Sequence, residues 1–132
     1  MTPQNKAANV KDEVGRDNEA LSAARLLLKA GLLNDAVSRA YYAAYHWTSA
    51  LLLSKGMEPK THRGKIQLLS LHFVRTGLIG EDAAAHLSRL EDFREASDYS
   101  AAVVFSRKDA ENAVQRAESF IEACKPLLSD LL

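Results

Sequence analysis

The sequence predicts an all-α protein, an up-and-down four-helix bundle with an additional short helix, five helices in total. Every long segment of the 132 residues carries apolar residues at helical spacing, and none shows the alternation of a strand. Short connections separate helices of similar length, which favours antiparallel neighbours. A chain of this length buries one core, so residues 10–132 are expected to form a single domain after a flexible N-terminal tail of residues 1–9.

The first predicted helix runs from about Val10 to Ala30 and ends at Gly31, a favoured residue just after a helix. Asn34 is expected to cap the second helix, which continues to Gly56.

The third predicted helix starts after Thr61, a second capping residue, and ends at Gly77. The fourth spans about Glu81 to Tyr99. Ser106, followed three residues later by Asp109, resembles a capping box before the fifth helix. The inward face of this fifth helix is predicted to carry Ala110, Val114, Ala117, Phe120, Ile121 and Cys124.

The stretch SRAYYAAYHW, residues 38–47, concentrates aromatic and charged side chains on the second helix. Tyr41 and Trp47 fall on its apolar face and are predicted to face the core or a partner. A polar strip follows the opposite face, with members Asp35, Arg39, Tyr42, His46 and Ser49. The strip is either solvated or binds an anion or a base, with Arg39 on phosphate, Tyr42 stacking and His46 hydrogen-bonding.

Arg94 is the unusual residue of the fourth helix because it falls within the apolar stripe of Ala83, Leu87, Leu90 and Phe93. Burying a guanidinium costs several kcal/mol unless it is paired. Asp98, one turn later, is the nearest partner, and this pair is one reading of the pattern. In the other reading, which we favour, Arg94 lines a cleft in which its planar fork suits phosphate.

Composition excludes several classes of protein. Seventeen basic and seventeen acidic residues give no overall field for nucleic acid, and one cysteine allows no internal disulfide. The four histidines lack metal-site spacing and no glycine-rich phosphate loop is present, so neither metal nor cofactor is predicted. Without an apolar membrane span or signal core, the protein is expected to be cytoplasmic.

His62, at the start of the third helix, is a candidate anion contact.

Four segments together resemble the HEPN domain, the higher eukaryote and prokaryote nucleotide-binding family, and its small stand-alone prokaryotic branch in particular. They read NDAVSRAYYAAYHWTSALLLSKGMEPKTHRG, HFVRTGLI, LEDFREASDYS and FSRKDAENAVQRAESFIEA. The resemblance covers roughly residues 16–125. It implies a helical bundle, commonly a homodimer, that binds a nucleotide or RNA. It also implies a small nucleotidyltransferase as partner, in a toxin–antitoxin or related module.

Many members of that family are metal-independent RNases that use an arginine and a histidine four to six residues apart. Arg94 occupies the arginine position, whereas Tyr99, preceded by Asp98, stands where the histidine would be. A tyrosine, whose pKa is about 10, is a poor proton-transfer group near neutral pH. The resemblance therefore implies nucleotide binding by Arg94, Asp98 and Tyr99, with Arg39 and Tyr42 as a second wall and His62 as an anion contact.

Two alternatives stay open at this point. The first is a metal-independent RNase toxin in which Arg94 acts with His46 or His62 as the proton-transfer group. The second is a non-catalytic structural interaction module whose polar strips are solvated.

Overall fold

The structure is a computed structural model that describes residues 2–99 and 102–129, and for Asp98 and Tyr99 it describes the backbone alone. The described chain is all-helical and consists of α1 (Pro3–Lys29), α2 (Leu33–Ser54), α3 (His62–Leu69), α4 (Glu81–Tyr99) and α5 (Arg107–Cys124). A π-helical turn, Ser70–Val74, continues α3, and a 3-10 turn, Lys125–Leu128, follows α5.

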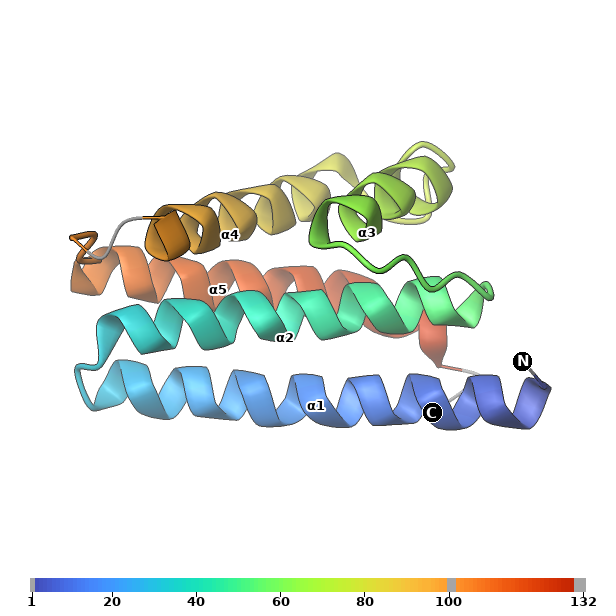
Figure 1. The fold of residues 1–132 in the computed structure, drawn as a ribbon, viewed down its shortest axis with the longest axis horizontal. Coiled ribbons are helices and arrows are strands. Elements are labelled where there is room, and N and C mark those ends of the chain that lie inside the picture. The colour runs from blue at the N-terminus through green and yellow to red at the C-terminus, as the bar shows by residue number, and fades with distance from the viewer. Residues whose placement is uncertain (1, 100–101, 130–132) are drawn as a thin grey trace.

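The four long helices α1, α2, α4 and α5 lie lengthwise beside one another, and the short α3 lies over the C-terminal half of α2 (Figure 1). This arrangement confirms the predicted bundle with its additional short helix. Helix α2 packs against each of α1, α3, α4 and α5, so its side chains meet residues from every other helix. No helix in the described ranges is both long and apolar enough to cross a membrane.

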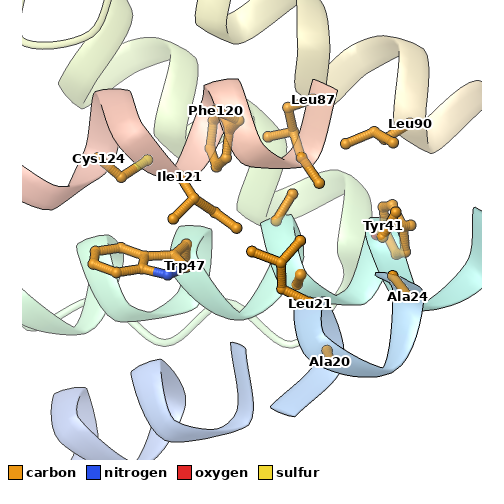
Figure 2. Packing of buried hydrophobic residues seen from close by; sticks show 14 of the residues in the cluster. Ala20, Leu21, Ala24, Tyr41, Trp47, Leu87, Leu90, Phe120, Ile121 and Cys124 are labelled. Carbon is orange, nitrogen blue, oxygen red and sulfur yellow. The ribbon is translucent and has the colours of Figure 1, made fainter. Parts of the chain in front are cut away.

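The core is built around α2, whose alanines are fully buried and let the neighbouring helices approach closely. Trp47 and Tyr41 lie at separate points along α2, with Leu21 and Ile121 between them and Leu87 and other apolar side chains above (Figure 2). Fully burying a large apolar side chain stabilises the fold by about 1.5–3 kcal/mol. The apolar stripes predicted for α4 and α5 are buried as expected.

Helix α1 begins earlier than predicted. Residues 3–9, expected to be a tail, are helical, and Thr2 caps them by accepting a hydrogen bond from the Asn5 amide at 3.1 Å. Pro3 occupies the first turn, where its missing N–H costs nothing. The expectation was wrong because these residues contain no apolar stripe, and Val10 is the first buried residue of the helix.

Asn34 does not cap α2, because the helix starts at Leu33 with Leu32 in the capping position. The Asn34 side chain instead donates to the Val103 carbonyl at 2.8 Å and accepts from the Phe105 amide at 2.9 Å. It therefore ties the start of α2 to the segment that precedes α5.

The predicted caps of α3 and α5 are confirmed, whereas the third helix, predicted to end at Gly77, is α-helical only to Leu69 and continues as the π-helical turn to Val74. Thr61 accepts from the Gly64 amide at 2.9 Å, and Ser106 and Asp109 form a reciprocal capping box. Gly31, Gly56 and Gly77 follow helix ends with φ of 82°, 76° and 79°, a conformation that favours glycine.

Candidate functional site

A row of aromatic side chains on α2, completed by one histidine of α3, forms the most chemically varied part of the molecule. We name Tyr41, Tyr42, Tyr45, His46 and His62 the aromatic cluster. Tyr41 and Tyr45 are one helical turn apart with ring centroids separated by 5.8 Å, and Tyr42 and His46 repeat this spacing at 6.4 Å. Except for Tyr41, which is fully buried, these side chains are half-buried, so part of each ring reaches solvent.

His62 joins the cluster because Thr61 starts α3 directly before it. Its ring stacks on Tyr45 at 4.4 Å between centroids and on Tyr41 at 5.7 Å. The Tyr41 hydroxyl also forms a hydrogen bond with Nδ1 of His62 at 2.5 Å. The start of α3 is thus held on α2 by ring stacking and by one hydrogen bond.

Cationic side chains from three helices lie over the tyrosine rings. Measured from the charged group to the ring centroid, the pairs are Lys65 and Tyr45 at 4.2 Å, Arg39 and Tyr42 at 4.9 Å, and Arg94 and Tyr41 at 5.3 Å. A cation over an aromatic ring contributes about 0.5–1 kcal/mol when exposed and more when desolvated. The cluster therefore brings flat rings and positive charges together where α2, α3 and α4 meet.

Arg94 is mostly buried, as its place on the apolar stripe predicted, with 19% of its side chain exposed. Its Nη2 and Nε donate to the two carboxylate oxygens of Glu91 at 2.9 and 3.3 Å. Glu91 on the preceding turn is thus a partner that the sequence prediction did not name. The predicted partner Asp98, and Tyr99 beside it, lie outside the side chains that the structure describes.

The charges around Arg94 fix the ionisation of its neighbours. Burial tends to raise the pKa of Glu91, but the hydrogen bond and charge of Arg94, with a hydrogen bond from Tyr41, lower it below the ordinary value. Burial raises the pKa of Tyr41, and the hydrogen bond and negative charge of Glu91 raise it further. At neutral pH Glu91 is therefore ionised and Tyr41 keeps its proton.

The predicted polar strip of α2 does not remain one surface. Ser49 is buried and accepts a hydrogen bond from Nζ of Lys65 at 2.9 Å, whereas Arg39 is exposed. His46 pairs through Nδ1 with Glu13 of α1 at 2.8 Å. Burial tends to raise the pKa of Glu13, but the hydrogen bond and charge of His46 outweigh it and lower the pKa.

A hollow of about 360 Å³ adjoins the cluster between α1, the C-terminal half of α2 and the loop before α3. Glu13, Ser49 and Lys65 belong to its wall, and Leu52, Leu53 and Met57 are apolar parts of its lining. The hollow therefore extends the surface of the aromatic cluster towards α1.

Comparison with known proteins decides the family. The HEPN domain model matches residues 14–127, most of the chain. The chain belongs to the HEPN domain family. The family resemblance, the all-helical fold and the short helix over the bundle all agree with this assignment.

Several curated proteins are similar to this HEPN domain. A UPF0332 protein of Thermotoga maritima is 35% identical over 116 residues, which is 88% of each chain. A protein of Methanocaldococcus jannaschii that carries the name "Putative toxin" is 37% identical over 120 residues, 91% of this chain and 87% of that protein. A UPF0332 protein of Pyrococcus horikoshii is 44% identical over 79 residues, 60% of this chain and 56% of that protein.

Within this HEPN domain the predicted site residues separate into groups. Arg94 and His62 lie beside the same Tyr41 ring, and the Tyr42 ring is 6.4 Å from that of His62. Arg39 lies over the Tyr42 ring. His46 lies beside Tyr42 and also pairs with Glu13 of α1.

Sequence reasoning missed four members of the site, which are Tyr41, Tyr45, Lys65 and Glu91. Tyr41 was assigned to the core, and it is fully buried, but its hydroxyl also contacts His62. The signals available were the one-turn spacing of Tyr41 and Tyr45 and the position of Glu91 one turn before Arg94.

Proposed function

We propose that this HEPN domain binds single-stranded RNA or a nucleotide through the aromatic cluster and the cations above it. The observation that supports this most is the set of three cation–ring pairs contributed by α2, α3 and α4. Proteins bind single strands by stacking bases on aromatic rings beside positive charges that meet the phosphates. Tyr42 and Tyr45 supply half-exposed rings, and Arg39 and Lys65 supply the charges.

Fluorescence anisotropy with a labelled single-stranded RNA tests this proposal. Loss of one stacking ring costs about 1–3 kcal/mol, so Tyr42→Ala is expected to weaken binding about tenfold. Arg39→Ala is expected to make the slope of log affinity against log salt concentration shallower by about one unit, because one phosphate contact is lost. Arg25→Ala is the matched control, because Arg25 lies on α1 and pairs with Glu118 of α5 at 3.2 Å. Equal weakening by all three variants would contradict the proposal.

Cleavage of RNA is a second candidate function, favoured by one observation. Arg94 and the His62 ring lie 5.3 and 5.7 Å from the centroid of Tyr41, so the fold brings a histidine from α3 near the arginine of α4. A histidine is the usual proton-transfer group near neutral pH. RNA degradation in excess chelator that is lost in both Arg94→Ala and His62→Ala supports this function. Binding without cleavage excludes it.

A small nucleotidyltransferase is the proposed partner, and a homodimer the proposed assembly, in a toxin–antitoxin or related module. Similarity to the Methanocaldococcus protein named as a toxin supports such a module. Co-purification after co-expression tests the partner, and light scattering after gel filtration tests the dimer. A monomer that elutes apart from the nucleotidyltransferase would contradict both.

A further inference from the structure

A fully buried carboxylate of α1 has one of its two oxygens without a partner. Asp17 has no exposed surface, and its Oδ2 accepts a hydrogen bond from the indole N–H of Trp47. Oδ1 is buried as well and has no hydrogen-bond partner among the residues that the structure describes. Buried polar atoms in proteins are as a rule hydrogen-bonded, and leaving a charged one unpaired is costly. Oδ1 is therefore an acceptor that a bound donor would satisfy.

Asp17 belongs to the wall of a hollow of about 290 Å³ between α1 and α5. The wall is built from side chains of these two helices and from Lys125 in the turn that follows α5. Small-molecule pockets have volumes of about 300–1,000 Å³, so a hollow of this size suits a small ligand. No residue of its wall belongs to the aromatic cluster, so it is separate from the proposed RNA site.

The charges in the wall leave Asp17 without an ion-pair partner. Glu118 pairs with Arg25 at 3.2 Å. Glu122 pairs with Lys125 at 2.9 Å. These pairs use both basic residues of the wall, whereas the third carboxylate, that of Asp17, has no such pair within the described ranges. A buried carboxylate is best stabilised by an opposite charge that also donates a hydrogen bond. A single positive charge with an N–H group meets both requirements.

We propose that this hollow binds the alkylammonium group of a small ligand, which donates a hydrogen bond to Oδ1 of Asp17. The single charge of the group matches the single unpaired carboxylate, and its N–H pairs the oxygen that the described residues leave unpaired. The wall also contains the buried apolar side chains of Leu21 and Ile121, which suit the alkyl part of such a ligand.

Entry of the ligand requires side chains of the wall to move, because Asp17 has no exposed surface. Glu122 and Lys125 are the side chains suited to this, since they are 71% and 52% exposed. Exposed ion pairs contribute little free energy, so separating this one costs little. The buried carboxylate is therefore reached through a weakly held part of the wall.

Trp47 gives the site its own reporter. It is the only tryptophan of the chain, so its indole N–H gives one identifiable signal in a proton–nitrogen NMR spectrum. Because this N–H is bonded to the Asp17 carboxylate, a donor that binds the other oxygen shifts the signal. Methylammonium chloride is titrated into the full chain, without RNA, at a pH of about 8, where an alkylammonium keeps its charge. Burial raises the pKa of Asp17 to about 7, so at this pH most of its carboxyl groups are ionised.

Two other salts separate a bound donor from a general effect of ions. Tetramethylammonium chloride carries the same charge without an N–H group, and potassium chloride supplies a cation that cannot donate. We expect methylammonium to shift the indole signal until the site is saturated, and the other two salts to leave the signal in place. No saturable shift with methylammonium, or an equal shift with either control salt, overturns the inference. This comparison uses the unmodified protein and needs no variant that must fold.

Asp17→Asn tests the carboxylate itself, because it removes the charge and keeps an oxygen for Trp47. This variant is expected to bind methylammonium about tenfold more weakly or less, the effect of losing a hydrogen bond to a charged group. Asp12→Asn makes the same change at an exposed carboxylate of α1, and it is expected to bind as the unmodified protein does. Undiminished binding by Asp17→Asn, with native circular dichroism, overturns the inference. The result does not depend on the proposed function, because no RNA enters the titration.

Discussion

Asp17 provides the sharpest test of the packing, because it is a carboxylate with no exposed surface in the middle of α1. Trp47 donates its indole N–H to Oδ2, whereas the buried Oδ1 has no hydrogen-bond partner among the described residues. Burial raises the pKa of Asp17 from 3.8 to about 7, against the opposing effects of the Trp47 hydrogen bond and nearby positive charges. Asp17→Asn removes this titration and keeps an oxygen for Trp47.

The direction and size of the effect follow from linkage. Because the pKa is raised in the folded state, the folded protein binds a proton more tightly than the unfolded chain between pH 3.8 and about 7. The free energy of unfolding therefore falls as the pH rises through this window, by up to about 4 kcal/mol from Asp17 alone. In Asp17→Asn this contribution is absent. The free energy of unfolding of the variant therefore increases relative to that of the unmodified protein as the pH rises.

Urea unfolding followed by the fluorescence of Trp47, with circular dichroism as a second probe, measures both proteins between about pH 4 and 8. The pKa values of Glu13 and Glu91 are lowered, so their titrations act in the opposite direction. These two titrations are the same in both proteins, so they cancel in the difference between the two free energies of unfolding. Asp12→Asn, an exposed carboxylate of α1, is the control. The reasoning would be refuted if the difference in free energy of unfolding between Asp17→Asn and the unmodified protein did not change with pH.

Three further predictions concern single side chains. Asn34→Ala is expected to lower the free energy of unfolding by about 1–3 kcal/mol in urea titration, because the Val103 carbonyl and the Phe105 amide lose their partner; no loss would contradict this. Thr61→Ala removes the cap of α3 and is expected to lower the free energy of unfolding by about 1 kcal/mol. It is also expected to weaken RNA binding in the same anisotropy assay, and stronger binding would contradict this. Cys124 is fully buried and its pKa is raised by burial, so iodoacetamide is expected to label it only after unfolding; mass spectrometry of the native protein checks this.

Most of the fold follows from local signals in the sequence. Thr61 and the pair Ser106 and Asp109 cap helices because each side chain bonds an amide three residues away. Asn34 was misassigned for the opposite reason, since its partners are 69 and 71 residues later. Local capping preference could not reveal a contact that exists only once α2 and α5 have packed.

The site was predicted less completely than the fold. Arg94 was found because a guanidinium on an apolar stripe breaks the helical pattern, and that signal lies within one helix. The hydrogen bond between Tyr41 and His62 joins two helices, and an apolar-face tyrosine gives no sign of where its hydroxyl points. Spacing alone identified the residue types of the site but not which of them meet.

Photo-cross-linking to RNA, with the modified peptides identified by mass spectrometry, tests the proposed binding site most directly. We expect cross-links at Tyr42, Tyr45 and His62, whose half-buried side chains reach solvent in part. Cross-links confined to the face of α1 and α5 around Arg25, with none on α2 or α3, would contradict the assignment of the aromatic cluster as the RNA site.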